Sequence, residues 1–317
     1  MFSNARLISV RIFFAVLLTC FSHLTFSSAA HQTKPAFDSI PALCARADSD
    51  DAAAQHRLTQ FLLSHYATDS DFSSALDCVR SQASRDNPGA QFLLGYLLEH
   101  GHGIAQDYVQ AAHNYQLAAA HGDSFAQNNL ASLYQRGLGV PRDLQKALAL
   151  YLSAAHQNNS AAQTNLASMY YAGAGVRRDF PEASRWFLAA ANQGDPVAQH
   201  NLGVLYFRGL GVPKDSVIAA RWIGLAAAQG LPSAESDLGL LYQTGSGVSR
   251  DYVAAYLWYS RALSAGDLSG ASHRDVVAHF LSAKQRDEAT AMASATSSPS
   301  LDSFAPAAGS LSILPTH

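Results

Sequence analysis

Charge is scarce in this 317-residue chain. Charged residues make up 14% of it, and 21 Lys and Arg stand against 24 Asp and Glu, for a formal net charge of −3. A chain without a basic excess lacks the attraction that draws proteins to nucleic acids and anionic membranes. We therefore expect no nucleic-acid partner.

The sequence also lacks the short motifs that signal common chemistry. It contains no Gly-x-Gly-x-x-Gly, phosphate loop, His-Glu-x-x-His, Cys-x-x-Cys, Ser-x-x-Lys or Gly-x-Ser-x-Gly. His100, His102, His113 and His121 lie near one another in the sequence, but with 13 histidines in the chain such a group is more often solvated than metal-bound. We expect no catalytic residue, no cofactor and no metal site.

The N-terminal hydrophobic run, Ile12–Cys20, is too short to span a membrane, which takes about 20 apolar residues. It follows Arg6 and Arg11 and precedes small residues that end at Ala30, the order of a secretory signal peptide. We predict cleavage after Ala30 and export to the periplasm or outside the cell. A lipoprotein signal is the less favoured alternative, because Thr19 stands where Gly or Ala is expected.

Only three cysteines occur, and signal cleavage would leave two of them, Cys44 and Cys78. An even pair in an oxidising compartment is more often bridged than free. We predict a disulfide between them; the alternative is that both are small buried hydrophobic residues.

Hydrophobic residues are plentiful, at 48%, and alanine dominates them, which favours closely packed helices over sheets. A 36-residue repeat organises this material and runs through residues 54–269 without insertion or deletion. Its leading alanine recurs as Ala54, Ala90, Ala126, Ala162, Ala198 and Ala234.

Each repeat is predicted to form two helices joined by a glycine turn. The leading Ala, a Leu four residues later and often a Tyr eight residues later share one helix face. A Gly-x-Gly-Val or Gly-x-Gly-Ile turn follows in five repeats and supplies the positive φ that ends the first helix. An Asp in every repeat then stands where an N-cap or a first-turn acid of the second helix is expected. That helix carries Trp186, Trp222 and Trp258 in the last three repeats.

This pattern resembles the Sel-one-like repeat (SLR) family, which is related to the tetratricopeptide solenoids. The resemblance covers roughly two thirds of the chain, and five repeats match well. The first departs, because Thr59, His65 and Ala67 replace the small residue and both glycines. The resemblance implies an all-α, α/α superhelical solenoid of helix-turn-helix repeats. It also implies a role in assembling protein complexes, without naming a partner.

The chain accordingly divides into five parts. We expect a signal peptide at 1–30, an N-terminal capping segment at 31–53 with a short helix around Pro41–Ala47, and six repeats at 54–269. A C-terminal capping helix at 270–293 hides the last apolar face of the solenoid, and a Ser/Ala/Pro-rich tail at 294–317 is predicted to be disordered.

The variable face of the first helices predicts where a partner binds. On a helical wheel, the positions two, six, nine and ten residues after the leading Ala lie opposite the core and vary between repeats. If first helices line the concave side, as in related solenoids, these positions form the groove floor, and aromatic residues beside arginine are typical of hot spots. The alternative is that Phe207 and Tyr171 pack against neighbouring repeats. The predicted partner-binding residues are Phe92, Tyr96, Arg136, Tyr171, His200, Phe207 and Arg208.

Asparagine recurs regularly at Asn129, Asn165 and Asn201. A peptide clamp is one interpretation, but a repeated position favours a structural hydrogen bond to neighbouring backbone. Asn158-Asn159-Ser160 is a glycosylation sequon, which matters only in a eukaryotic source.

Three functions follow from these features. We favour an exported, non-enzymatic scaffold that binds a protein or peptide in its concave groove. The alternatives are a cell-envelope enzyme acting on peptidoglycan, or a regulator of one, against which the missing catalytic motifs argue, and a eukaryotic lumenal adaptor. The partner's identity and the oligomeric state stay open.

Overall fold

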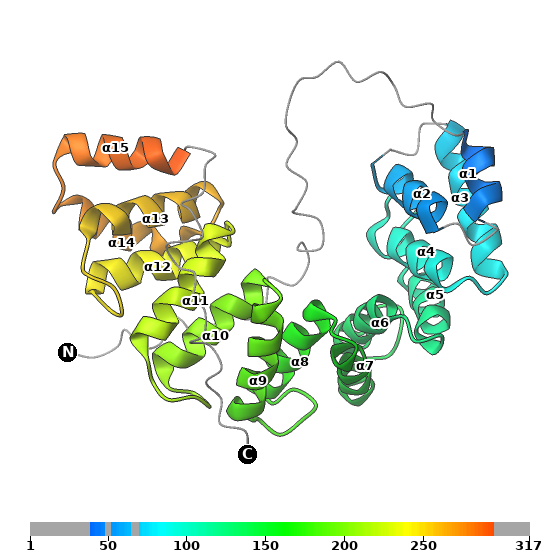
Figure 1. Ribbon diagram of the computed structural model, residues 1–317, viewed down its shortest axis with the longest axis horizontal. Helices are drawn as coiled ribbons and strands as arrows, with labels where there is room; N and C mark the ends of the chain where they lie inside the picture. Colours follow the sequence, from blue (N-terminus) through cyan, green and yellow to red (C-terminus); the bar gives the residue numbers. More distant parts are fainter. Residues whose placement is uncertain (1–38, 48–51, 65–69, 295–317) are drawn as a thin grey trace. The chain divides into compact units, whose positions relative to one another are not determined.

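The computed structural model describes residues 39–47, 52–64 and 70–294. Within these residues every regular element is helical, with fifteen α-helices, one short 3-10 helix and no strand (Figure 1). The helices pack in consecutive pairs, which confirms the predicted all-α solenoid class. The predicted signal peptide, the rest of the segment before residue 39 and the tail beyond residue 294 lie outside the described residues.

Two compact units divide the described chain, 39–162 and 163–294, and each is considered by itself. The elements are α1 (Ile40–Ala47), α2 (Ala52–Ser64), α3 (Ser70–Ser84), α4 (Pro88–His100), α5 (Tyr108–Ala120), α6 (Ser124–Arg136), α7 (Leu144–His156), α8 (Ser160–Ala172), α9 (Phe180–Asn192), α10 (Pro196–Arg208), α11 (Ser216–Ala228), α12 (Pro232–Thr244), α13 (Tyr252–Ser264), η1 (Leu268–Gly270), α14 (Ala271–Ala278) and α15 (Ala283–Ser294).

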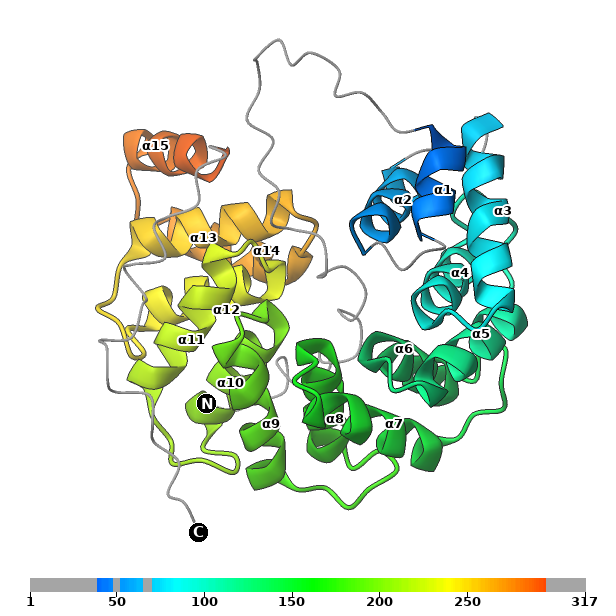
Figure 2. The same cartoon turned by 45° about the vertical axis from the view of Figure 1, so that its right-hand side comes forward.

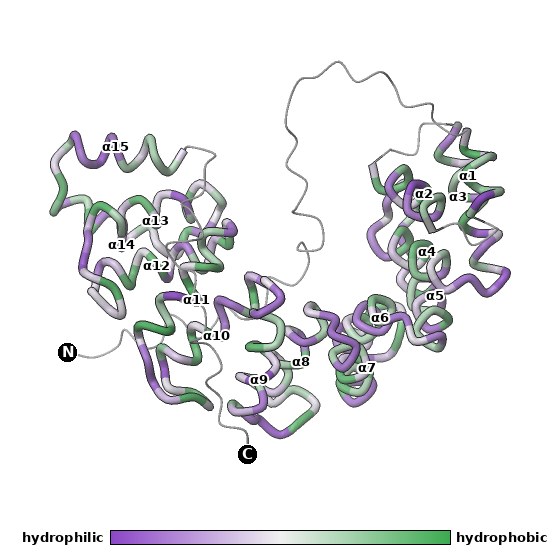
Figure 3. The backbone as a smooth tube through the Cα atoms, in the orientation of Figure 1, coloured by the Kyte–Doolittle hydropathy of each residue, from purple (hydrophilic) through white to green (hydrophobic). Residues whose placement is uncertain are grey.

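Local sequence explains how the repeat helices begin and end. The Asp of the repeat caps the second helix in the five later repeats: Asp215, for example, accepts the N–H groups of Val217 and Ile218 at 2.8 and 2.9 Å. The first glycine of the turn closes the first helix in the left-handed conformation, with φ of 69° at Gly209. Hydrophobic and hydrophilic residues are interspersed along each helix, so one face can turn to its neighbours (Figure 3).

The second glycine of the turn has a role beyond its positive φ. A Cβ atom on Gly211 would overlap the backbone of Phe180, and one on Gly247 would overlap the carbonyl oxygen of Ser216. Each turn therefore lies against the start of the second helix of the preceding repeat. Only glycine allows so close an approach.

A buried glutamine after the leading Ala ties successive repeats together. In α10, Gln199 donates to the carbonyl oxygen of Ala191 at 3.2 Å and accepts from the side chain of Gln229 at 2.8 Å. In the last repeat Glu235 holds this position, and Arg261 donates to it at 2.9 Å. These bonds satisfy polar groups that would otherwise be costly to bury between helices.

The start of the array is built differently from the rest. Helix α1 packs against both α2 and α3, and its Ile40 and Leu43 are buried in one core with Leu58 and Phe72. A disulfide joins Cys44 of α1 to Cys78 of α3, with Cα atoms 5.9 Å apart. This segment covers the apolar end of the first repeat.

We expect this disulfide to form in the exported protein. The chain that begins after Ala30 should then show no free thiol when it is unfolded without reductant, and the Cys78→Ser variant should show one. Titration with a chromogenic disulfide reagent measures both. Two reactive thiols in material that is folded before the assay would contradict the pairing.

The end of the array contains two helices in place of the single capping helix predicted at 270–293. Both α14 and α15 pack against α13 (Figure 2). Ser282 and Gln285 form a capping box, in which each accepts the backbone N–H of the other, at 3.3 and 3.0 Å. Arg286 meanwhile donates to the carbonyl oxygens of Ala278 and Leu281. The Ser-x-x-Gln signal for this helix start is present in the sequence, from Ser282 to Gln285.

Candidate functional site

The seven predicted partner-binding residues fall in two units, and each set is described separately. Phe92, Tyr96 and Arg136 belong to residues 39–162. Tyr171, His200, Phe207 and Arg208 belong to residues 163–294.

In the second set, a shallow pocket of about 280 Å³, open solvent included, brings Phe207 and Arg208 together. Apart from Arg208 and Asp237, its lining is aliphatic or aromatic. The lining residues are Val204, Phe207 and Arg208 of α10, Ile223 of α11, and Asp237, Leu240 and Leu241 of α12.

His200 reaches the same place from α10, through Asp237. Its Nε2 lies 2.8 Å from the Asp237 carboxylate, and their side chains are 15% and 23% exposed. The pair joins two successive first helices and holds one wall of the pocket. His200 therefore has a structural partner, and its part in binding would be indirect.

Phe207 fits both interpretations of the sequence. Its ring is half-buried and packs against two core clusters, one around Phe187 and Trp222, the other around Ile223 and Leu238. It also lines the pocket, so it supports the core and presents an apolar surface to solvent.

Tyr171 lies away from that pocket lining. Its ring is 5.4 Å from that of Phe180 in an edge-on arrangement, and the Arg178 guanidinium lies 6.0 Å from the Phe180 ring. Tyr171 thus belongs to an aromatic group at the start of α9.

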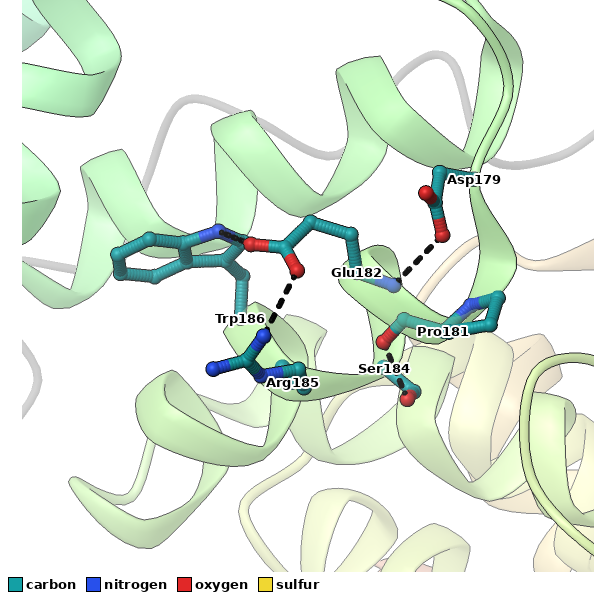
Figure 4. Close-up of polar contacts among 6 residues, drawn as sticks. All are labelled: Asp179, Pro181, Glu182, Ser184, Arg185 and Trp186. Atoms are coloured by element: carbon teal, nitrogen blue, oxygen red, sulfur yellow. Dashed lines mark hydrogen bonds and ion pairs between the residues drawn. The ribbon is translucent and has the colours of Figure 1, made fainter. Parts of the chain in front are cut away.

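That end of α9 is held by a compact polar network (Figure 4). Asp179 accepts the N–H of Glu182 at 2.9 Å. The Glu182 carboxylate then accepts from the Trp186 indole N–H at 2.9 Å and from Arg185 at 3.2 Å. Trp186, the first of the three repeat tryptophans, is only half-buried, and its indole N–H bonds to this carboxylate.

The residue nine positions after the leading Ala varies between repeats, and this variation has a structural cause that the helical wheel does not reveal. In three repeats, a buried tyrosine sixteen residues later donates to a Glu or Gln there. The pairs are Tyr115 to Glu99 at 2.8 Å, Tyr151 to Gln135 at 3.0 Å and Tyr259 to Gln243 at 2.7 Å. Burial raises the pKa of all three hydroxyl groups, which keeps them protonated donors.

Two repeats have an apolar pair instead. Tyr171 and Phe207 stand nine residues after the leading Ala of their repeats. Sixteen residues further on, Phe187 follows Tyr171 and Ile223 follows Phe207. The two positions change together, so an apolar pocket floor arises where the tyrosine donor is absent. A search for paired columns sixteen residues apart would have found this signal.

Asn129 has the structural role expected of the asparagine column, although its partner is a side chain. It donates to the hydroxyl of Tyr115 at 3.1 Å. Asn201, at the equivalent position, is 7% exposed.

In residues 39–162, two of the predicted residues, Phe92 and Tyr96, lie beside other rings. Tyr96 stacks on His100 with ring centroids 4.2 Å apart. The Phe92 ring lies 6.0 Å from those of Tyr115 and Phe125. Phe125 is 54% exposed and was not predicted, because it precedes the leading Ala, where most repeats have a smaller residue.

Two further observations concern only the part of the chain that the structure describes. Its side chains include no group of three or more His, Cys, Asp or Glu that could hold a metal ion. Its helices include none that is both long and apolar enough to cross a membrane.

Comparisons with known proteins agree with this architecture. The Sel1 repeat family matches five consecutive stretches, 88–123, 124–159, 160–195, 196–231 and 232–267. No match begins before residue 88, where the first repeat departs from the pattern. A comparison with curated proteins gives no match.

Solved structures with the same repeat are similar along much of the chain. A protective antigen of uropathogenic Escherichia coli with an SLR fold is 34% identical, with a TM-score of 0.72 over 80% of this chain, and the match spans only 55% of that antigen. A Sel1 repeat protein from Oxalobacter formigenes is 28% identical, with a TM-score of 0.61 over 69% of this chain and 92% of its own. Since the family match extends over more than half of the sequence, the chain belongs to the Sel1 repeat family.

Proposed function

We propose that this protein is an exported, non-enzymatic scaffold that binds a protein or peptide partner on the face formed by its first helices. Sel1 repeat proteins are generally repeat scaffolds, and the fold is typically used for protein interaction. Export is supported by the signal-peptide pattern and by the Cys44–Cys78 disulfide, a bond that persists in oxidising compartments.

The pocket between α10 and α12 is the observation that carries this proposal. Its lining combines an aromatic ring, aliphatic side chains and an arginine at the surface, the composition of a binding hot spot. Arg208 forms no hydrogen bond or ion pair with another residue that the structure describes, in contrast to Asp215, which caps α11. A surface of this kind is available to another molecule.

Removing the Phe207 ring is expected to weaken partner binding by about 1–3 kcal/mol, because a half-buried aromatic side chain at a hot spot loses most of its contact area. The partner is to be captured from the native envelope fraction with the wild-type protein as bait. Its affinity for purified Phe207→Ala is then measured by calorimetry, well below the variant's melting temperature.

Val217→Ala is the matched control. Val217 is 57% exposed on α11 and is not part of the pocket lining, so its truncation should leave the affinity unchanged. If Phe207→Ala lowers the melting temperature while the folded fraction binds the partner normally, the binding surface lies elsewhere. Failure to capture any partner would argue against the scaffold role itself.

A further inference from the structure

We infer that the pocket between α10 and α12 recognises an acidic peptide segment in which one aliphatic or aromatic side chain has a carboxylate close beside it. This inference rests on the proposed function, since it names the chemistry of a partner for that same surface. It follows from the distribution of charge around the pocket and from the pocket's lining.

The carboxylates of the surrounding repeats already have partners. Between residues 163 and 269 five of the eight accept backbone N–H groups at helix starts, namely Asp179, Asp195, Asp215, Asp251 and Asp267. The other three bond to basic side chains: Glu182 to Arg185, Glu235 to Arg261 and Asp237 to the His200 imidazole. The negative charge of this unit is therefore engaged in its own folding.

The cations are not all engaged in the same way. Arg185 and Arg261 pair with carboxylates, and Arg178 and Arg250 lie over aromatic rings. Arg208, like Arg177 and Lys214, forms no hydrogen bond or ion pair with any other residue that the structure describes, and of these three only Arg208 lines the pocket. It leaves one positive charge open at the pocket's edge.

Asp237, the one acid in the lining, bonds to His200 at 2.8 Å and forms no ion pair with Arg208. A guanidinium binds a carboxylate through two parallel hydrogen bonds, the strongest pairing open to it. The remaining lining of Val204, Ile223 and Leu240, with Phe207, favours an apolar side chain. An apolar surface with a cation at its edge suits a short peptide motif better than a bulky ligand.

Fluorescence anisotropy with three labelled twelve-residue peptides tests this inference on the mature protein at low salt, where charge effects are least screened. The peptides carry Glu-Leu-Glu, Lys-Leu-Lys or Glu-Ser-Glu in an otherwise identical Gly/Ser sequence. We expect the first to bind about tenfold or more tightly than the other two. Comparing Glu-Leu-Glu with Lys-Leu-Lys isolates the effect of charge, and comparing it with Glu-Ser-Glu isolates the effect of the apolar side chain.

The variant Arg208→Glu should reverse the order of the two charged peptides. Lys214→Glu is the matched control, because it makes the same change in charge at an exposed position outside the pocket lining and should preserve the order. Equal binding of both charged peptides, the same reversal in Lys214→Glu, or no binding of any peptide would overturn the inference. If a natural partner is nevertheless captured and its binding depends on Phe207, the scaffold proposal survives and only the acidic motif fails.

Discussion

Replacing Arg261 by alanine is expected to lower the free energy of unfolding by about 3–5 kcal/mol at neutral pH, the usual cost of leaving one member of a buried ion pair alone. The Glu235 and Arg261 side chains are 3% and 13% exposed, and their hydrogen bond is 2.9 Å long. Arg261 also lies 5.4 Å from the Trp258 ring. The variant loses both contacts and strands a buried carboxylate.

The size of this loss should depend on pH. Burial raises the pKa of Glu235, and Arg261 opposes that rise. Without Arg261 the folded-state pKa rises further above its unfolded value of about 4.3. A carboxyl group with a raised pKa destabilises the fold when ionised and not when protonated, so the loss should shrink as the pH falls from neutral through the raised pKa toward about 4.

Urea unfolding of the wild type and variant between pH 4.5 and 8 measures this effect. In Glu235→Gln/Arg261→Ala the group that titrates is gone, so its difference from Arg261→Ala should appear at neutral pH and fade in acid. Arg185→Ala is the surface control: its pair with Glu182 is more exposed, and its loss should stay below about 1 kcal/mol. A small or pH-independent loss in Arg261→Ala would contradict the assignment of Glu235–Arg261 as a buried pair.

The repeat helices could be predicted because their signals are local. The Asp that caps a second helix and the glycine that ends a first helix act within a few residues of their own positions, and the repeat displays each of them five or six times. The two C-terminal helices occur once, outside the repeat. Their boundary depends on the single capping box at Ser282, which the hydrophobic spacing around Val276 and Phe280 does not reveal.

Contacts between distant columns were harder to predict. A glutamine follows the leading Ala in the first five repeats, but the bond between Gln199 and Gln229 becomes visible only once helices thirty residues apart are packed together. The same holds for Tyr259 and Gln243. Such pairs depend on helix packing as well as helix formation, and one sequence supplies little information about packing geometry.

The candidate site shows the same limit. A helical wheel separates the two sides of an isolated helix, yet Val204 and Glu99 lie opposite the predicted core and are 7% and 6% exposed. Neighbouring helices cover them. His200 was likewise placed on the binding face, but its ring bonds to Asp237 of the next first helix. The wheel places Phe207 and Arg208 on one face of α10, but it could not show which side chains of that face remain free.

Trp222→Ala is expected to destabilise the protein by about 3–5 kcal/mol, the range for truncating a buried tryptophan. Trp222 is 3% exposed and shares one core with Phe187, Leu202 and Leu205. Its removal would leave a cavity that the rigid helix pairs fill only in part. Thermal and urea unfolding should therefore show a large loss, while partner affinity, measured where the variant is still folded, should change far less than in Phe207→Ala.

Trp186→Ala is the matched comparison, because Trp186 occupies the same column one repeat earlier. Its half-buried ring has less apolar area to lose, and the bond from its indole N–H to Glu182 lies near the surface. If burial decides the contribution of each tryptophan, Trp186→Ala should cost clearly less than Trp222→Ala, since the cost follows the volume left unfilled. Equal losses would mean that the column position, and not the packing of each ring, sets the stability of the repeat. A marked loss of partner affinity in folded Trp222→Ala would show that the core of this repeat also shapes the pocket that Phe207 lines.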